Sequence, residues 1–241
     1  MHPGEWTLDV AALALVPGIG VGYALLARRF RPEPARVACA VAAELLLVAV
    51  LATPLHTLAT HYLLSAHLLQ NVVLAEWAPA LLVLSLPAGL AARAERVRAF
   101  RVATTPWLAL PLWLAVYDTW HVPWLYDAAL RHPSSLLLVE HVSYLVCGFL
   151  MWWPVFQGRR LSSAGRTAYV FVAFVAASPL GLLLALVPHA VYSTYAHAPR
   201  VWLSPLTDQQ VAGIAMASEE AIVFFLVFFW AFRGLLDADD S

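Results

Sequence analysis

The sequence predicts an all-α integral membrane protein: one domain, residues 1–241, folded as a bundle of seven transmembrane helices. Composition is the first observation, because 62% of the residues are hydrophobic and only 12% are charged, against about half and about a quarter in soluble domains. The second is that the apolar residues form seven runs near the roughly 20 residues that cross about 30 Å of hydrocarbon. A net charge of −1 gives no sign of a nucleic-acid partner, so the expected surrounding is the lipid bilayer.

The seven runs are separated by breaks that hold arginine, proline or other polar residues, as expected between spans. A short turn near PLHTLATH is expected to join the second run to the third. Two cysteines lie far apart and form no C-x-x-C pair, which excludes a thiolate metal motif of that kind. The predicted spans are, in order, 8–27, 37–56, 61–85, 104–121, 134–156, 167–187 and 211–232.

The basic residues, 14 in number and all arginine, predict the orientation. Loops on the cytoplasmic side of a membrane carry an excess of positive charge. With the N-terminus outside, all but two arginines fall in inner segments, so we expect an outer N-terminus and a cytoplasmic C-terminus. The two outer arginines are Arg131 and Arg200, and the inner ones are Arg28, Arg29, Arg31, Arg36, Arg93, Arg96, Arg98, Arg101, Arg159, Arg160, Arg166 and Arg233.

Histidines gather on the side opposite to these arginines. At 1.5 Å per residue, His67 and His141 lie roughly 9–10 Å below the outer ends of their helices. His121 ends the fourth span, and Asp118 lies one turn before it, a spacing that suits a carboxylate orienting a ligand histidine. Apart from the terminal His2, every histidine falls on the outer side or in the outer half of the membrane: His56, His61, His67, His121, His132, His141, His189 and His197.

Five glutamates lie inside predicted spans, where each carboxylate costs about 2.5–3.5 kcal/mol. Protonation, pairing with a histidinium or a shared metal cation would each relieve that cost. Protonation is the simplest explanation for two deep residues, Glu44 and Glu76. For Glu140, Glu219 and Glu220, which lie near the histidine layer, pairing or metal binding is at least as good an explanation.

These side chains predict a metal site with His67, His121 and His141 as ligands. Candidate helpers are Asn71, Asp118, Glu140, Met216 and Glu219. Imidazole and carboxylate suit copper, zinc or iron, and a thioether favours Cu(I). Two alternatives remain open. His67 and His141 could be axial haem ligands, or the polar groups could form hydrogen bonds between the helices of a ligand-free scaffold.

Three stretches carry a resemblance: SAHLLQNVVLAEWAPALLVLSLPAGL, HVPWLYDAALRHPSSLLLVEHVSYLVCGFLMWWPVF and SPLTDQQVAGIAM. They resemble the CtaG-type cytochrome c oxidase assembly factors of bacteria, a multi-span membrane family of the caa-type oxidase branch. The similarity covers about residues 60–230, and its matching residues include His67, His121, Glu140, His141 and Asp208. Where many relatives carry two further histidines, this chain has Asn71 and Leu137.

The resemblance implies an assembly factor of the bacterial plasma membrane that is not an enzyme and acts with cytochrome c oxidase subunits. Copper handling on the outer face is the chemistry it implies. Because Asn71 and Leu137 replace histidines of relatives, His61 or Glu219 are the expected substitute ligands. Asp208 has two readings, as a site residue matched by the family or, like Thr207, as the N-cap of the seventh helix.

Overall fold

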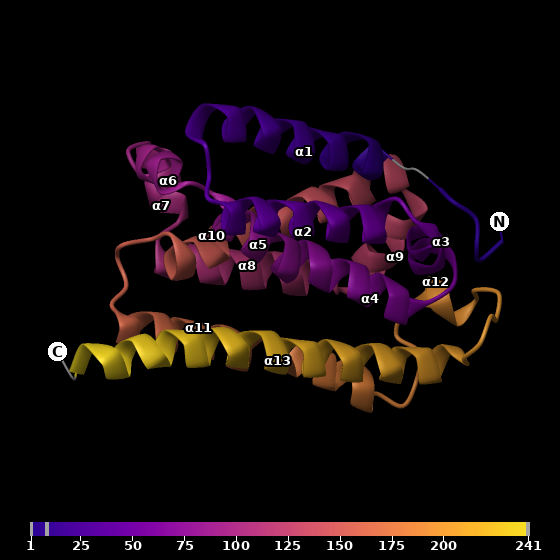
Figure 1. Ribbon diagram of the computed structural model, residues 1–241. Coiled ribbons are helices and arrows are strands. Elements are labelled where there is room, and N and C mark those ends of the chain that lie inside the picture. Colours follow the sequence, from indigo (N-terminus) through magenta and orange to yellow (C-terminus); the bar gives the residue numbers. More distant parts are fainter. Residues whose placement is uncertain (1, 8–9, 240–241) are drawn as a thin grey trace.

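The computed structural model describes residues 2–7 and 10–239, and within them the chain forms helices and no strands (Figure 1). Residues 8 and 9, at the start of the first predicted span, lie outside the described residues. The helices are α1 (Val10–Phe30), α2 (Pro34–Leu51), α3 (Pro54–His61), α4 (Leu64–Val72), η1 (Val73–Trp77), α5 (Ala78–Ser85), α6 (Ala88–Ala94), α7 (Arg98–Ala103), α8 (Pro106–Trp120), α9 (Pro123–Arg131), η2 (Pro133–Leu137), α10 (Leu138–Phe156), α11 (Ser163–Leu186), α12 (Ser193–Ala196) and α13 (Pro205–Asp239).

Six continuous helical segments of the described chain are long and apolar enough to cross a bilayer. They correspond to six of the seven predicted spans. The remaining prediction, 104–121, corresponds to α8, whose 15 residues extend only about 22 Å at 1.5 Å per residue. The six segments are Val10–Phe30, Pro34–Leu51, Leu64–Ser85, Pro133–Phe156, Ser163–Leu186 and Pro205–Gly234.

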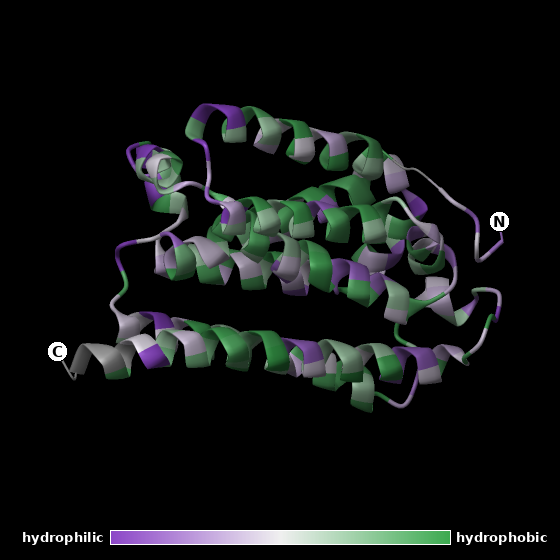
Figure 2. Ribbon diagram, in the orientation of Figure 1, coloured by the Kyte–Doolittle hydropathy of each residue, from purple (hydrophilic) through white to green (hydrophobic). Residues whose placement is uncertain are grey.

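The core lies among α2, the continuous helix α4–η1–α5, α8 and α10, which pack against one another. α1 lies outside this group against α2, and the pair α11 and α13 forms a separate layer that contacts α4 through α13 (Figure 1). Figure 2 shows hydrophobic residues along the long helices and hydrophilic ones mainly in the loops and at helix ends. This distribution is that of a helical membrane bundle.

Glycines let the helix backbones approach closely, as small residues do in membrane bundles. A Cβ added to Gly148 of α10 would lie 2.1 Å from the carbonyl oxygen of Ala75 in η1. On the pair α11 and α13, a Cβ at Gly213 would lie 2.5 Å from the carbonyl oxygen of Gly181. The first contact fixes α10 beside η1, where a π-helical turn interrupts the α-helix between α4 and α5.

The two ends of the bundle differ in chemistry. One end carries α6, α7, the α1–α2 and α10–α11 connections and the C-terminal part of α13, and so the arginines predicted to be inner (Figure 1). The other end carries α3, α9, α12 and the start of α13 (Figure 1). Because α8 leads from α7 to α9, it runs from the arginine end to the histidine end, as the predicted fourth span requires.

The connection between the second and third spans is a helix, α3, where the sequence predicted a short turn. Thr53 caps it, since its side chain accepts a hydrogen bond from the Leu55 amide at 3.2 Å. Pro54 occupies the first turn, where its missing N–H costs nothing. The chain therefore forms about two helical turns at the histidine end of the bundle, where a short turn was expected.

Candidate functional site

His67 lies near the start of α4 and is 1% exposed. Its Nδ1 is 2.8 Å from the Tyr195 hydroxyl, and that hydroxyl donates its own hydrogen to the carbonyl of Ala59. Burial raises the pKa of Tyr195 well above its usual value, so this hydroxyl has one hydrogen to give. Nδ1 of His67 must therefore be the donor, so a lone pair of this ring can only be on Nε2. That Nε2 has no hydrogen-bond partner.

His121 repeats this arrangement at the C-terminal end of α8. Its Nδ1 lies 2.8 Å from the carbonyl oxygen of Tyr117, an atom that only accepts, so Nδ1 carries the hydrogen. Its Nε2 is buried without a hydrogen-bond partner. An imidazole oriented by an Nδ1–H bond, with Nε2 free, is the usual state of a metal-ligating histidine. The sequence assigned the orienting role to Asp118, but Asp118 is exposed and the Tyr117 carbonyl makes the bond.

A tyrosine ring lies beside both histidines. The Tyr126 ring on α9 has its centroid 4.9 Å from that of His67 and 6.0 Å from that of His121. Tyr192 packs on Tyr126 at 4.1 Å and donates a hydrogen bond of 3.1 Å to the carbonyl of His121. We call His67, His121, Tyr126, Tyr192 and Tyr195 the histidine–tyrosine cluster. It joins α4, α8, α9 and the α11–α13 connection at the histidine end.

Glu140 is the acidic neighbour of this cluster. Its Oε1 lies 3.7 Å from Nε2 of His67 and accepts a hydrogen bond of 3.2 Å from Nδ2 of Asn71. Both Glu140 and Asn71 are 1% exposed. Adjacent residues of a helix point in directions about 100° apart, so Glu140 faces α4 while its neighbour His141 faces elsewhere. Asn71 therefore holds a carboxylate close to the free nitrogen of His67.

His141 is fully buried on α10 and belongs to a second group of side chains. Its ring lies edge-on to that of His56, with centroids 6.4 Å apart, and Nδ1 of His56 is 3.0 Å from Nε2 of Gln70. Over residues 2–7 and 10–239, no group of three or more histidine, cysteine or acidic side chains is arranged to hold a metal ion. The described site thus offers two free imidazole nitrogens, on His67 and His121.

The other expected helpers lie elsewhere. His61 is exposed at the end of α3, where its Nδ1 is 2.7 Å from the Thr60 hydroxyl, and partial burial lowers its pKa. Met216 is buried on α13 and lines, with Glu219, a small pocket of about 40 Å³ between α4 and α13. Glu219 accepts a hydrogen bond from the indole of Trp77, so these two residues belong to a different layer from the histidine–tyrosine cluster.

Three carboxyl groups meet inside the bundle, toward the arginine end from the cluster. Glu76, on the π-helical turn, is fully buried and lies within electrostatic reach of Glu219 and Glu220. Glu220 accepts a hydrogen bond of 3.0 Å from the Tyr117 hydroxyl. Tyr117 therefore touches both layers, since its carbonyl orients His121 and its hydroxyl contacts Glu220. The sequence assigned no functional role to Glu76.

Asp208 holds α4 in place. Its carboxylate accepts hydrogen bonds from the amide of Leu64 at 2.6 Å and the amide of Ser65 at 3.3 Å, and from the Ser65 hydroxyl. Asp208 on α13 thus acts as the N-cap of α4. The capped residue Leu64 lies three residues before His67. Ser204 caps the N-terminus of α13, since its hydroxyl accepts a hydrogen bond from the Thr207 amide at 3.2 Å. The suggestion that Asp208 or Thr207 caps the seventh helix is therefore wrong, because α13 begins earlier, at Pro205.

Two further motif residues hold the loop that carries Tyr192 and Tyr195. Asp127 accepts hydrogen bonds from the Ser193 amide and hydroxyl and from the Thr194 amide, at 2.7–3.1 Å. Burial alone would raise the pKa of Asp127, but these hydrogen bonds outweigh it and lower the pKa below its usual value. Gln209 accepts from the amide of Val191 at 2.7 Å. Tyr192 and Tyr195, which this loop carries, are therefore fixed in position.

The tyrosines were not predicted as site residues. Aromatic side chains near span ends are normally membrane-interface anchors, and nothing in the sequence sets Tyr126, Tyr192 and Tyr195 apart from such anchors. The one signal that could have been used is Asp127, which follows Tyr126 in an aromatic loop. An acid buried there needs hydrogen-bond donors, and Ser193, which follows Tyr192, supplies them. Nothing in the spacing of 126 and 192 could show that the two rings lie in contact.

Comparison with known proteins gives one family. The profile of the cytochrome c oxidase caa3 assembly factors, Caa3_CtaG, matches residues 21–238, which is nearly the whole chain. Searches of curated proteins and of solved structures gave no match. The matched range includes every residue of the histidine–tyrosine cluster and all three intramembrane carboxyl groups. The chain belongs to the caa3 cytochrome c oxidase assembly factor family, as its three motif stretches predicted.

Proposed function

We propose that this membrane assembly factor holds a copper ion as cargo in the histidine–tyrosine cluster and passes it to a subunit of cytochrome c oxidase. His67 and His121 supply the first two ligands through Nε2. The observation that carries the proposal is that both rings have Nδ1–H committed to an acceptor and a buried Nε2 without one. An imidazole nitrogen with its lone pair available is a good ligand for copper.

Glu140 and His141 are the next candidate ligands. Glu140 already lies 3.7 Å from Nε2 of His67, and a cation between the two would relieve the cost of a buried carboxylate. His141 is the adjacent residue on α10, and its ring lies against His56. Two imidazole nitrogens fixed in place, with the Glu140 carboxylate beside one of them, suit an ion that is held and then released, and this role requires no catalysed reaction.

We also propose the orientation that delivery requires. α8 would complete a seventh crossing, because it connects the arginine end to the histidine end (Figure 1). The arginine end then faces the cytoplasm by the positive-inside rule. The N-terminus and the cluster face outward in the bacterial plasma membrane. Copper would be presented on that outer side, where the oxidase subunit would receive it.

The haem alternative has less support. That alternative takes His67 and His141 as the axial ligands, and an axial histidine needs open space beside its nitrogen for a flat macrocycle. Here the Tyr126 ring centroid lies 4.9 Å from that of His67, and the His56 ring centroid lies 6.4 Å from that of His141. A ligand-free scaffold would also explain the bonds of Asp127 and Asp208 to neighbouring segments. It would not explain two buried imidazoles that leave the same nitrogen without a hydrogen-bond partner.

The test is a Cu(I) titration of the detergent-purified protein against a coloured competing chelator. We expect about one copper per chain for the wild type, and at least a ten-fold lower affinity for His67→Ala and for His121→Ala. His132→Ala is the matched control, because His132 is an exposed histidine of the same end and its loss should change nothing. Equal copper binding by all four proteins would refute the site, and a haem absorption band lost in His67→Ala would favour the alternative.

A further inference from the structure

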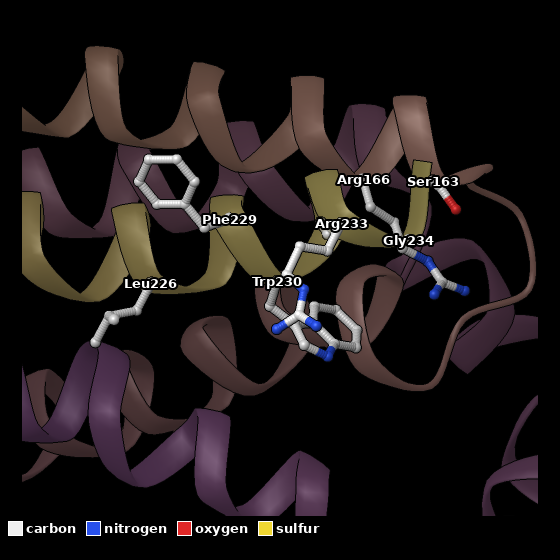
Figure 3. A pocket seen from close by; sticks show the side chains of 8 residues that line it. Ser163, Arg166, Leu226, Phe229, Trp230, Arg233 and Gly234 are labelled. Carbon is white, nitrogen blue, oxygen red and sulfur yellow. The ribbon is translucent and has the colours of Figure 1, made fainter. Parts of the chain in front are cut away.

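A pocket of about 560 Å³ opens at the arginine end, between the start of α11 and the C-terminal part of α13. Figure 3 shows the side chains that line it, with Arg166, Arg233 and Ser163 on one side and Leu226 and Phe229 farther along α13. None of its lining residues belongs to the histidine–tyrosine cluster or to the group of carboxyl side chains formed by Glu76, Glu219 and Glu220. The proposed function therefore leaves this pocket without a role.

The polar part of the pocket is positively charged. Two lining residues are arginines, Arg166 and Arg233, and among the side chains that the structure describes no acidic one lines the pocket. The guanidinium of Arg166 donates one bond, from Nη2 to the carbonyl of Gly158 at 3.1 Å, but its Nε is buried without a partner. Ser163 is the first residue of α11, whose 24 residues direct the positive end of the helix dipole toward the pocket. The pocket therefore combines the positive charge of two arginines with an unpaired donor, the Nε of Arg166, and an anion would satisfy both.

The rest of the pocket is apolar and accessible. Leu226, Phe229 and Trp230 of α13 are each more than half exposed, on a face that runs away from the arginines toward the middle of the membrane segment. The span on α13 ends at Gly234, and the span on α11 begins at Ser163. Both arginines therefore lie at the depth of lipid headgroups, and the apolar side chains lie at the depth of acyl chains.

We propose that this pocket binds one anionic phospholipid, with its phosphate on Arg166 and Arg233 and its acyl chains along Leu226, Phe229 and Trp230. Basic pockets between membrane helices at the cytoplasmic surface bind acidic lipid headgroups in this way. The shared chemistry is a phosphate group, so inorganic phosphate is the other source to be distinguished. The apolar side chains favour the lipid, because acyl chains can pack against them and inorganic phosphate cannot.

The test is native mass spectrometry of the full chain in detergent, with three probes: phosphatidylglycerol, phosphatidylcholine and inorganic phosphate. We expect one phosphatidylglycerol to stay bound to the wild type, with phosphatidylcholine held much more weakly. Arg233→Gln should weaken phosphatidylglycerol about five-fold, the effect of removing one charge near a lipid surface. It is preferred to Arg166→Gln, because Arg166 also holds the backbone at Gly158.

Arg98→Gln is the matched control. Arg98 is an exposed arginine of the same end and outside the pocket, so general attraction to acidic lipid would be reduced equally by both variants. Loss of phosphatidylglycerol in Arg233→Gln only supports the pocket. Equal loss in both variants, equal binding of phosphatidylcholine, or equal retention of inorganic phosphate would each overturn the proposal. Melting temperatures of the variants show that each has folded.

Discussion

Asp208→Ala tests the connection between the fold and the site. The substitution removes the carboxylate that accepts hydrogen bonds from the Leu64 amide, the Ser65 amide and the Ser65 hydroxyl. Asp208 is 2% exposed, so water does not readily replace it. His67 follows Leu64 by three residues on the same helix. Loss of the cap should therefore loosen both α4 and the ligand that it carries.

The magnitude follows from these bonds. A hydrogen bond to a charged group contributes about 1.5–3 kcal/mol, and loss of an N-cap costs about 0.5–2 kcal/mol. The bonds share one carboxylate and overlap with the cap, so we expect a total loss of about 3 kcal/mol. For a chain of this size, that lowers the melting temperature by roughly 6–12 °C. Asp208→Asn keeps one good acceptor, so its melting temperature should lie between those of the wild type and Asp208→Ala.

The assay is thermal unfolding in detergent, followed by circular dichroism, together with the Cu(I) titration. Asp118→Ala is the control, because it removes an exposed carboxylate of a membrane helix and should leave both readings unchanged. If Asp208→Ala melted with the wild type, the cap would contribute nothing and the reasoning would be refuted. A normal melting temperature with lost copper binding would show instead that Asp208 acts on the ion directly.

Three further outcomes are expected. Tyr195→Phe removes the acceptor of the Nδ1–H bond of His67 and should weaken Cu(I) binding about ten-fold in the same titration; because it also removes the hydrogen bond to the carbonyl of Ala59 and leaves a buried donor unsatisfied, it should lower the melting temperature as well. Gly148→Ala places a Cβ against a backbone oxygen and should lower the melting temperature strongly or prevent folding, whereas Gly22→Ala, which meets nothing within 4 Å, should not. Glu220→Gln keeps a side chain that can accept a hydrogen bond and removes a buried ionisable group, so its melting temperature should equal or exceed that of the wild type; a large fall would mean that the charge itself is needed.

The membrane-spanning character of the chain was predictable because hydropathy is a local property. Runs of about 20 apolar residues predicted six segments that the structure contains. α8 shows the limit of this approach: its apolar run looks like a span, but Pro106 starts the helix and Trp120 ends it after 15 residues. Length alone therefore does not establish a seventh crossing. The path of α8 from one end of the bundle to the other depends on its packing against α10 and on its connections to α7 and α9.

The sequence by itself determined the fold class, the family, the separation of arginines from histidines and the choice of His67 and His121 as candidate ligands. Residue type and spacing along a helix are enough for these conclusions. Only the tertiary structure decided that Tyr126 lies beside both rings, that His141 lies against His56, and that Asp208 caps α4 from 144 residues away. These facts rest on contacts between distant segments, and a side chain's hydrogen-bond partners, which fix its tautomer and its free nitrogen, are set by packing and not by sequence neighbours.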